Sequence, residues 1–333
     1  MATLRIVDRY NAARTGIGSA LPTLSTPTYF PAISSICSTA DPGTLIRLLT
    51  EARYPRALVS AYDCKNRIPD GLSGARRVIA GLRSVGCMII LDSGAFECQV
   101  LGTIDWSRAN YHEVSAAVPH DILMSFDAVS PSVGRRDGAI EDTDHPHTDR
   151  SPTRTVNVVH GQHRASLLEN IRSALSTGPC AGIAVPDRDC GPDLLSRTRT
   201  IAEVRRLMDK ADETLLLHIL GCGNPVVMAA YVVAGADTFD SLDWAQGAVD
   251  IRSLTLTEPT LLRGTGCRCK ACGTFRGPDV QIAMLHNLLF FQEFSAQLRV
   301  MVRDQTILDF LHAFTGRQLT QDIFRACSMS ARD

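Results

Sequence analysis

Short apolar, β-branched segments alternate along this chain with longer stretches of helical period. The helix-like stretches repeat apolar residues every three or four positions and lie at 43–52, 72–85, 164–176, 193–210 and 225–234. The strand-like segments lie at 28–33, 56–62, 88–92, 122–127, 155–160, 182–186, 215–220 and 237–240. Eight strands that alternate with helices over roughly 210 residues predict a closed (β/α)8 barrel, the TIM-barrel class of α/β folds.

The end of the chain departs from this alternation. We expect the barrel to occupy residues 1–262, and a small subdomain followed by C-terminal helices to occupy 263–333 and pack on it. Residues 280–302 have a strong helical pattern. The connection at 128–154 is long, polar and poor in helix signals, which is typical of a functional or mobile loop.

Composition narrows the class of protein. The chain has 333 residues, 45% of them hydrophobic, and a formal net charge of -1, so its overall charge does not indicate a nucleic-acid binder. It has no apolar run long enough to cross a bilayer and no apolar core of a signal peptide at its start. Its eleven scattered cysteines do not suggest a disulfide framework. These features predict a cytoplasmic protein with no membrane partner.

Polar residues stand where the predicted strands end. Asp92 ends the third strand, Asp127 the fourth and Asp240 the eighth, while His160 ends the fifth and Gly221 follows the seventh. In a barrel of this class the carboxyl ends of the strands form the active site. A single aspartate at such a point is as well explained as the N-cap of the next helix. Three carboxylates and a histidine on one rim predict a catalytic site.

Three cysteines lie close together near the end of the chain. Cys267, Cys269 and Cys272 form a C-x-C-x₂-C motif, and His286 follows on the helical segment 280–302. Three thiolates and one imidazole complete the tetrahedral coordination of Zn²⁺. Because four protein ligands leave no open position, we expect one structural zinc ion per chain.

These motifs together resemble the tRNA-guanine transglycosylase superfamily. "GCRCKACG" followed by "LHNL" resembles its zinc signature, and "LDSGAFE" (91–97) is similar to its Asp-Ser-Gly-Gly-Phe-Gln block. Further blocks follow in the family's order: "STPTYFPAI", "SFDAV", "VVHG", "GIAVPD", "LGCGNP" and "GADTFDS". The resemblance covers about residues 25–300. It implies a pentosyltransferase that replaces guanine in a nucleic acid with a 7-deazaguanine base such as preQ0.

The resemblance also implies roles for individual residues. Asp240 matches the nucleophile, Asp92 the acid and base that handles protons on the two bases, and Asp127 the carboxylate that binds the guanine edge. The zinc ligands match Cys267, Cys269, Cys272 and His286. The remaining substrate-binding positions are Ser93, Gly94, Phe96 (which stacks on the base), His160, Gly182, Ile183, Ala184 and Gly221.

The chemistry of base exchange independently requires such residues. Replacement of a base with retention at C1′ needs two displacements, and a carboxylate is a suitable covalent nucleophile for them. A second carboxyl group protonates the departing base and deprotonates the incoming one. Asp237 and Asp243 are rival nucleophiles by position, and we rank both below Asp240.

The chain departs from the tRNA enzymes of the family at four points. Residues 242–247, Leu-Asp-Trp-Ala-Gln-Gly, lack the Pro-Thr-Arg stretch expected after the nucleophile, and His160 replaces a glutamine. The interval from Cys272 to His286 is about half the usual length, and the chain ends soon afterwards, which leaves no room for an appended RNA-binding domain. We therefore favour DNA over tRNA as the partner, as in DNA-guanine transglycosylases; a tRNA-modifying enzyme is the alternative.

Two further alternatives remain open. An inactive nucleic-acid-binding subunit of a transglycosylase is disfavoured by the presence of Asp92, Asp127 and Asp240 together. An unrelated barrel hydrolase with a coincidental zinc motif predicts no guanine exchange. Partner proteins and a homodimer are both compatible with the sequence. Basic residues of the zinc segment can contact phosphates or simply face solvent: Arg263, Arg268, Lys270 and Arg276.

Overall fold

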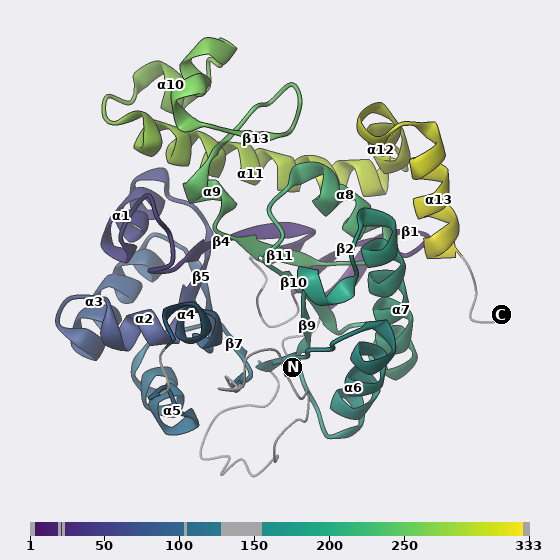
Figure 1. Cartoon of the computed structure of the whole chain (residues 1–333), viewed down its shortest axis with the longest axis horizontal. Coiled ribbons are helices and arrows are strands. Elements are labelled where there is room, and N and C mark those ends of the chain that lie inside the picture. The colour runs from purple at the N-terminus through teal and green to yellow at the C-terminus, as the bar shows by residue number, and fades with distance from the viewer. Residues whose placement is uncertain (1–3, 19–20, 22–23, 103–104, 128–154, 329–333) are drawn as a thin grey trace.

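A closed barrel of eight parallel strands forms the centre of the computed structural model, which describes residues 4–18, 21, 24–102, 105–127 and 155–328 (Figure 1). The connection at 128–154 lies outside the described residues. The order β10-β11-β4-β5-β6-β7-β8-β9 confirms the predicted TIM barrel. The strands are β4 (Thr28–Ile33), β5 (Arg56–Ser60), β6 (Met88–Asp92), β7 (Ile122–Met124), β8 (Thr155–Val158), β9 (Gly182–Pro186), β10 (Leu216–Leu220) and β11 (Thr238–Ser241).

Helices surround the barrel (Figure 1). Those of the first half are α1 (Pro42–Ala52), α2 (Ala61–Asn66), α3 (Gly71–Ser84), α4 (Ala95–Leu101) and α5 (Arg108–Ala117). Those of the second half are α6 (Arg164–Ser176), the 3₁₀ turn η2 (Asp187–Cys190), α7 (Leu194–Asp212), α8 (Pro225–Val233) and α9 (Asp243–Gln246). Of these helices, α1, α3, α6, α7 and α8 lie at the five predicted positions. None of the described helices is long and apolar enough to cross a membrane.

Three strands end earlier than the sequence predicts. β7 ends at Met124 and β8 at Val158, so Asp127 and His160 lie beyond their strands instead of ending them. The reason is local in the second strand. It ends at Ser60 instead of continuing to residue 62, because Ser60 begins a helix: its hydroxyl accepts a hydrogen bond from the backbone N–H of Asp63, at 3.4 Å. The apolar residues Ala61 and Tyr62, which extended the strand pattern, are instead buried in the first turn of α2. Buried helix positions and buried strand positions cannot be distinguished over so short a run.

The two-residue period of the strands carries the rim aspartates into the barrel mouth. In β6, Met88 and Ile90 belong to the interior cluster, whereas Ile89 and Leu91 pack against the surrounding helices. Asp92 continues the inward series at the last position of the strand. Asp240 has the same phase in β11, where its outward-facing neighbour Phe239 packs with the helices.

The sequence pattern did not predict the antiparallel sheet at the N-terminus. It consists of β1 (Leu4–Tyr10), β2 (Ala13–Gly18) and β3 (Ser25–Thr26). Leu4, Leu21 and Leu24 pack with the side chains of the barrel interior. The backbone N–H of Leu4 donates to the carbonyl of Thr214, just before β10, at 2.9 Å. The sheet therefore closes the end of the barrel where the strands begin, opposite the mouth.

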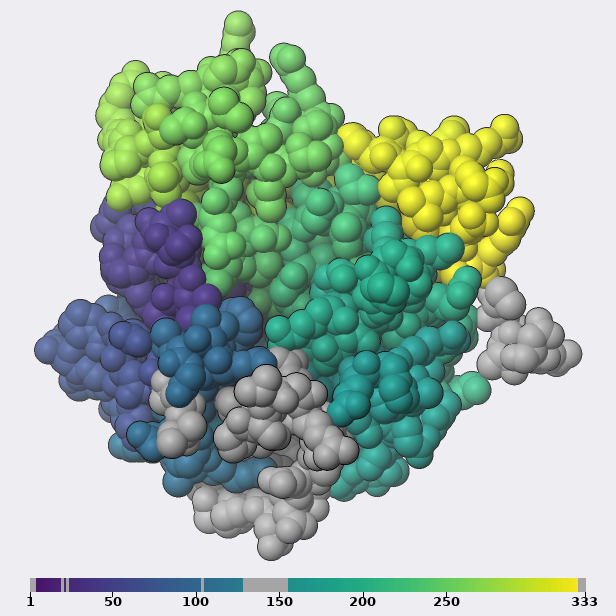
Figure 2. All heavy atoms as spheres, in the orientation of Figure 1, coloured from purple at the N-terminus to yellow at the C-terminus, as the bar shows by residue number. Residues whose placement is uncertain are grey.

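The long helix α11 (Asp279–Arg303) runs beside the barrel and connects two lobes (Figure 1). At its start lie the 3₁₀ turn η3 (Pro259–Thr265) and α10 (Lys270–Thr274), with the small sheet of β12 (Ala248–Val249) and β13 (Leu256–Thr257). Figure 2 shows this lobe in green beside α1. At the other end, α12 (Ile307–Thr315) and α13 (Arg317–Ser328) form the yellow lobe that contacts α7 and α8.

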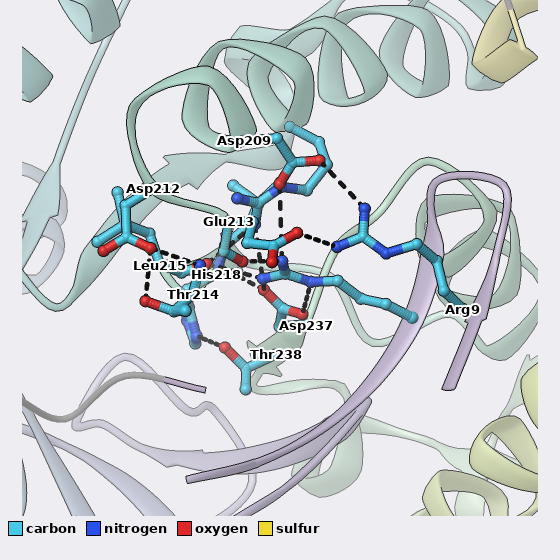
Figure 3. Close-up of polar contacts among 12 residues, drawn as sticks. Arg9, Asp209, Asp212, Glu213, Thr214, Leu215, His218, Asp237 and Thr238 are labelled. Carbon is cyan, nitrogen blue, oxygen red and sulfur yellow. Dashed lines mark hydrogen bonds and ion pairs between the residues drawn. The ribbon is translucent and has the colours of Figure 1, made fainter. Parts of the chain in front are cut away.

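A buried ion pair joins the N-terminal sheet to the bottom of the barrel. Arg14 of β2 makes two hydrogen bonds to the Asp237 carboxylate, at 2.7 and 2.6 Å, and a third to the carbonyl of Leu215 at 2.7 Å. Both side chains of the pair are almost completely inaccessible. Asp237 also accepts the backbone N–H of Leu217 at 2.8 Å. At the edge of this network Arg9 reaches Glu213 from the protein surface (Figure 3).

Replacement of Arg14 tests the importance of this pair. Arg14→Ala removes the bidentate partner of the buried Asp237 carboxylate and leaves Arg205, 3.5 Å away, as its remaining cation among the described residues, so we expect a loss of about 3–5 kcal/mol in the free energy of unfolding. The matched change Arg9→Ala removes an exposed partner and should cost about 1 kcal/mol or less. Urea unfolding with equal m-values measures both. Equal costs for the two variants would show that the buried pair does not hold the sheet to the barrel.

Candidate active site and metal centre

A cavity of about 860 Å³ opens at the carboxyl ends of the barrel strands. It collects seven of the residues that the sequence predicted for the site: Asp92, Ser93, Phe96, Asp127, His160, Gly221 and Asp240. Gly182, Ile183 and Ala184 are not among its lining residues. They are buried in β9 below the rim, and the cavity is lined instead by the residues that follow, from Pro186 to Asp189. The structure therefore does not bring these three to the cavity.

Asp240 is held by donors on one of its two carboxylate oxygens. Oδ1 lies 3.0 Å from Nε2 of His218 and 3.3 Å from the backbone N–H of Gly221. His218 is fully buried in β10, and its Nδ1 lies 2.9 Å from the hydroxyl of Thr238. Because an ionised carboxylate can only accept hydrogen bonds, Nε2 of His218 is the donor to Oδ1. This arrangement fixes Oδ1 and leaves Oδ2 as the oxygen available for reaction.

Asp92 faces the same cavity from β6. Its Oδ2 accepts the backbone N–H of Gly94 at 3.0 Å. Gly94 has a φ of +82°, and a Cβ there would lie 2.5 Å from the Cβ of Tyr62, so the turn requires glycine. Burial, together with the negative charges of Asp240 and Asp127, raises the pKa of Asp92 to about 6. A carboxyl group with a pKa in this range can both give and take a proton near neutral pH.

Asp127 forms a charged chain with two residues from neighbouring strand ends. His160 lies between Asp127 and Asp189. Its Nε2 is 2.8 Å from Oδ2 of Asp127, and its Nδ1 is 2.8 Å from Oδ2 of Asp189. Burial alone lowers the pKa of His160, but the two carboxylates outweigh it and raise that pKa to about 9. At neutral pH both ring nitrogens of His160 therefore donate, one to each carboxylate. In this arrangement His160 influences a molecule in the cavity through its hydrogen bond to Asp127.

Ser93 and Phe96 occupy different depths of the site. Ser93 is buried, and its carbonyl accepts the indole N–H of Trp106 at 2.8 Å, which fixes the backbone after Asp92. The side chain of Phe96, in the first turn of α4, is 43% exposed at the edge of the cavity. An aromatic ring in this position has a free face on which a planar base can stack.

The two rival aspartates have different environments. Asp237 is fully buried at the opposite end of the barrel in its pair with Arg14, so it cannot reach a substrate in the cavity. Asp243 lines the cavity close to Asp240, and its backbone N–H donates to the hydroxyl of Ser241 at 3.1 Å. Burial is the main factor that raises the pKa of Asp243. Asp243 is therefore the alternative nucleophile, and an experiment must distinguish it from Asp240.

Sequence reasoning missed three side chains of the site. His218 lies one inward position below the rim, and the inward series of Leu216, His218 and Leu220 was a signal for it. Asp189 lies in η2, beyond the predicted end of the sixth strand. Glu97, inside the block "LDSGAFE", lines the cavity, although it occupies the position of an uncharged glutamine in the family pattern.

The four predicted metal ligands converge at the start of α11. Nδ1 of His286 lies 3.5, 3.4 and 3.6 Å from the sulfur atoms of Cys267, Cys269 and Cys272. One ligand atom from each residue lies within 4.8 Å of every other. Tetrahedral zinc, with Zn–S of about 2.3 Å and Zn–N of about 2.0–2.1 Å, requires N···S separations of roughly 3.5 Å. The cluster therefore fits a zinc ion held by four protein ligands.

The other ring nitrogen of His286 supports the same interpretation. Nε2 lies 2.9 Å from the carbonyl of Val249, to which it can only donate, so the lone pair of Nδ1 faces the thiols. The adjacent Asn287 is fully buried and bonds to the backbone of the same segment: its amide donates to Trp244 and Gly247 and accepts from Val249. The metal-binding helix thus fixes the chain that follows the strand of Asp240.

The lobe that carries the cluster has basic side chains on its surface. Arg268, Lys270 and Arg276 are exposed. Arg263 is also exposed, and it pairs with Asp279 at 2.6 Å. Three of the four basic residues that the sequence indicated are therefore accessible and have no ion pair among the described residues, as a phosphate-contacting surface requires.

Comparison with known proteins gives a distant relationship. No family model matches the chain. It is 25% identical over 217 residues to the tRNA-guanine(15) transglycosylase of Archaeoglobus fulgidus, covering 58% of this chain and 43% of that protein. It is 23% identical over 275 residues to the enzyme of the same name from Methanopyrus kandleri, covering 77% and 57%, and 25% identical over 186 residues to that of Thermoplasma volcanium, covering 49% and 27%.

The chain is distantly similar to archaeal tRNA-guanine(15) transglycosylases. It spans about half the length of the first two of these relatives. This similarity agrees with the superfamily that the sequence motifs suggested. It does not single out the DNA-modifying branch, which the sequence analysis favoured.

Removal of one thiol tests the metal site. We expect about one zinc ion per purified chain, and Cys272→Ser should lose it together with much of the folding stability that the metal contributes. Cys180→Ser changes a buried cysteine far from the cluster in the sequence and should keep the metal. Elemental analysis and thermal unfolding measure both. A metal-free wild-type chain with the same melting temperature as a zinc-loaded sample would contradict the assignment.

Proposed function

We propose that this protein is a guanine transglycosylase, which exchanges guanine in a nucleic acid for a 7-deazaguanine base through a covalent aspartyl intermediate. One observation carries the proposal. Asp92, Asp127 and Asp240 line a single cavity, and each has different hydrogen-bond partners: the Gly94 N–H for Asp92, His160 for Asp127, and His218 with the Gly221 N–H for Asp240. The site thus offers a nucleophile, an acid and a hydrogen-bond acceptor, the three parts that this exchange needs.

The first half of the exchange releases guanine. Oδ2 of Asp240 attacks C1′ of the target nucleotide while protonated Asp92 gives its proton to the departing base. The C1′–N bond breaks, and a C1′–O bond to Asp240 forms. The donors from His218 and Gly221 stay on Oδ1, where they stabilise the carboxylate that leaves again in the second half.

The second half reverses these steps with another base. The incoming 7-deazaguanine loses its ring N–H proton to Asp92, and its nitrogen attacks C1′. Asp240 leaves as a carboxylate, so two inversions give net retention. Because the target base must leave its stack to enter a barrel mouth, the substrate is a flipped or unpaired nucleotide.

In this proposal Asp127 and Phe96 bind the base. The Asp127 carboxylate can accept hydrogen bonds from the N1–H and the 2-amino group of guanine. The His160 imidazolium donates to its Oδ2 and holds the carboxylate in place. Phe96 stacks on the base from the open edge of the cavity.

Two observations bear on which polymer is the substrate, and they favour different polymers. The relatives above are named for tRNA, and this favours tRNA as the substrate. The segment that follows the nucleophile, residues 242–247, lacks the Pro-Thr-Arg stretch of the tRNA enzymes, and this keeps DNA as a second candidate. We take tRNA first, because one of these alignments covers 77% of the chain, while the departures from the tRNA enzymes are local.

Trapping the covalent adduct tests the proposal. Asp240→Asn should abolish guanine exchange and the adduct seen on a denaturing gel, while the zinc content stays unchanged. Asp243→Asn changes a neighbouring carboxyl group of the same cavity and should keep the adduct. If the adduct survives in Asp240→Asn and disappears in Asp243→Asn, the nucleophile is Asp243 and the alignment has slipped by three residues.

Replacement of Asp127 tests base recognition. Asp127→Ala removes the acceptor and leaves buried donors of the base unpaired, which should cost about 2–4 kcal/mol of transition-state stabilisation. The expected decrease in kcat/KM for guanine is roughly 30- to 1,000-fold. A decrease below threefold would show that Asp127 does not contact the base.

A further inference from the structure

Glu97 is a cavity residue to which the proposed exchange has so far given no role. It lies in the first turn of α4, five residues after Asp92, and its side chain is only 3% exposed although it lines the cavity. A buried glutamate beside catalytic carboxylates is costly if it is ionised. Its presence there requires a physical explanation.

The surroundings of Glu97 supply no positive charge. Ser34, after β4, donates its hydroxyl hydrogen to Oε1. Oε2 is buried and has no hydrogen-bond partner among the described residues, and no described lysine or arginine pairs with the carboxyl group. The charged groups that act on it are two more carboxyl groups, Asp92 from β6 and Asp63 from α2. A proton on Glu97 is therefore the way to avoid a further unpaired negative charge.

The other titratable groups that face Glu97 are neutral thiols. Cys98 of α4 and Cys64 of α2 both feel its charge, and burial raises the pKa of Cys98 to about 12 and that of Cys64 further still. Asp63 is the better candidate for ionisation in this group, because it accepts hydrogen bonds from the backbone N–H and the hydroxyl of Ser35, both at 2.6 Å.

The two acids Asp92 and Glu97 hold their protons over different pH ranges. Burial and the carboxylates of Asp92 and Asp63 raise the pKa of Glu97 to about 8, whereas the pKa of Asp92 rises to about 6. Between these values an isolated Asp92 has lost the proton that it needs as an acid. Glu97 still has one.

We propose that Glu97 stores the proton that Asp92 delivers to the leaving base. The inference rests on the proposed function. As Asp92 gives up its proton, the carboxylic acid of Glu97 passes one to it, and the C1′–N bond breaks as the C1′–O bond to Asp240 forms. In the second half, the N–H proton of the incoming base goes to Asp92 and back to Glu97, so the cycle neither gains nor loses a proton.

The pH dependence of base exchange in Glu97→Gln tests whether Glu97 stores this proton. The assay measures incorporation of tritiated guanine into bulk tRNA and, separately, into single-stranded DNA. We expect the wild-type rate to hold to about pH 8 and the Glu97→Gln rate to fall from about pH 6. At pH 8 the variant should be slower on the order of 100-fold, with a much smaller difference at pH 6. Glu169→Gln, an exposed change on α6, should match the wild type.

Two further measurements keep the test independent of a single variant. Ser34→Ala removes the hydrogen bond that stabilises the ionised form of Glu97, so its alkaline limit should move to higher pH. The melting temperature needs no substrate. The folded chain binds the Glu97 proton more tightly than the unfolded chain does, so wild-type stability falls as pH rises from about 4.3 to about 8. Glu97→Gln lacks this loss, and its melting temperature should increasingly exceed the wild-type value across that range.

The outcomes separate this inference from the proposed function. Superimposable pH–rate profiles for wild type and Glu97→Gln, or a melting-temperature difference that stays constant from pH 5 to 9, would overturn the proton store alone. A wild-type chain that incorporates guanine into neither polymer would overturn the proposed function, and the proton store with it.

Discussion

The crowding of carboxyl groups at the mouth of the barrel is the constraint on which the site depends. Asp92, Asp127, Asp240 and Glu97 line one cavity, and so many like charges cannot all be ionised in a partly dry pocket. The structure stabilises each of these carboxyl groups in a different way. Donors from His218 and Gly221 hold Asp240, an imidazolium neutralises Asp127, and protons remain on Asp92 and Glu97 at higher pH than usual. Different environments for the same functional group are what assign different chemical roles.

Aspartates at the two ends of strand β11 have different roles, one in stability and one in the proposed chemistry. Asp237, just before the strand, is sealed by Arg14 and by the N-terminal sheet, so its charge is fully compensated and out of reach. Asp240 lies three residues further on, where the donors of His218 and Gly221 occupy only one of its oxygens. The metal-binding helix then fixes the segment that follows through Asn287. The rim is therefore built between two rigid supports, as a site that must hold a reacting atom in place requires.

Much of the fold could be predicted from the sequence because its signals are local. Apolar runs and helical periods located every barrel strand, and the closely spaced cysteines identified the metal cluster. The N-terminal sheet was missed because β2 and β3 have few apolar residues although they are mostly buried, and the interior contacts of Leu4 depend on closure of the barrel. The roles of His218 and Glu97 depend on partners distant in the sequence, Asp240 and Ser34, although the inward phase of β10 was a local signal for the position of His218. Backbone positions such as Gly182 were carried over from the family motif, and the structure does not bring them to the cavity.

Transfer of labelled guanine into a polymer tests the central claim most directly. The zinc-loaded protein is incubated with tritiated guanine and, in separate reactions, with bulk tRNA, single-stranded DNA and duplex DNA, and the polymer is then isolated. We predict that label enters tRNA, at a rate that Glu169→Gln leaves unchanged and Asp240→Asn abolishes. Label in DNA alone would keep the chemistry and change the substrate. No label in any polymer, from a folded protein that contains its metal, would contradict the account.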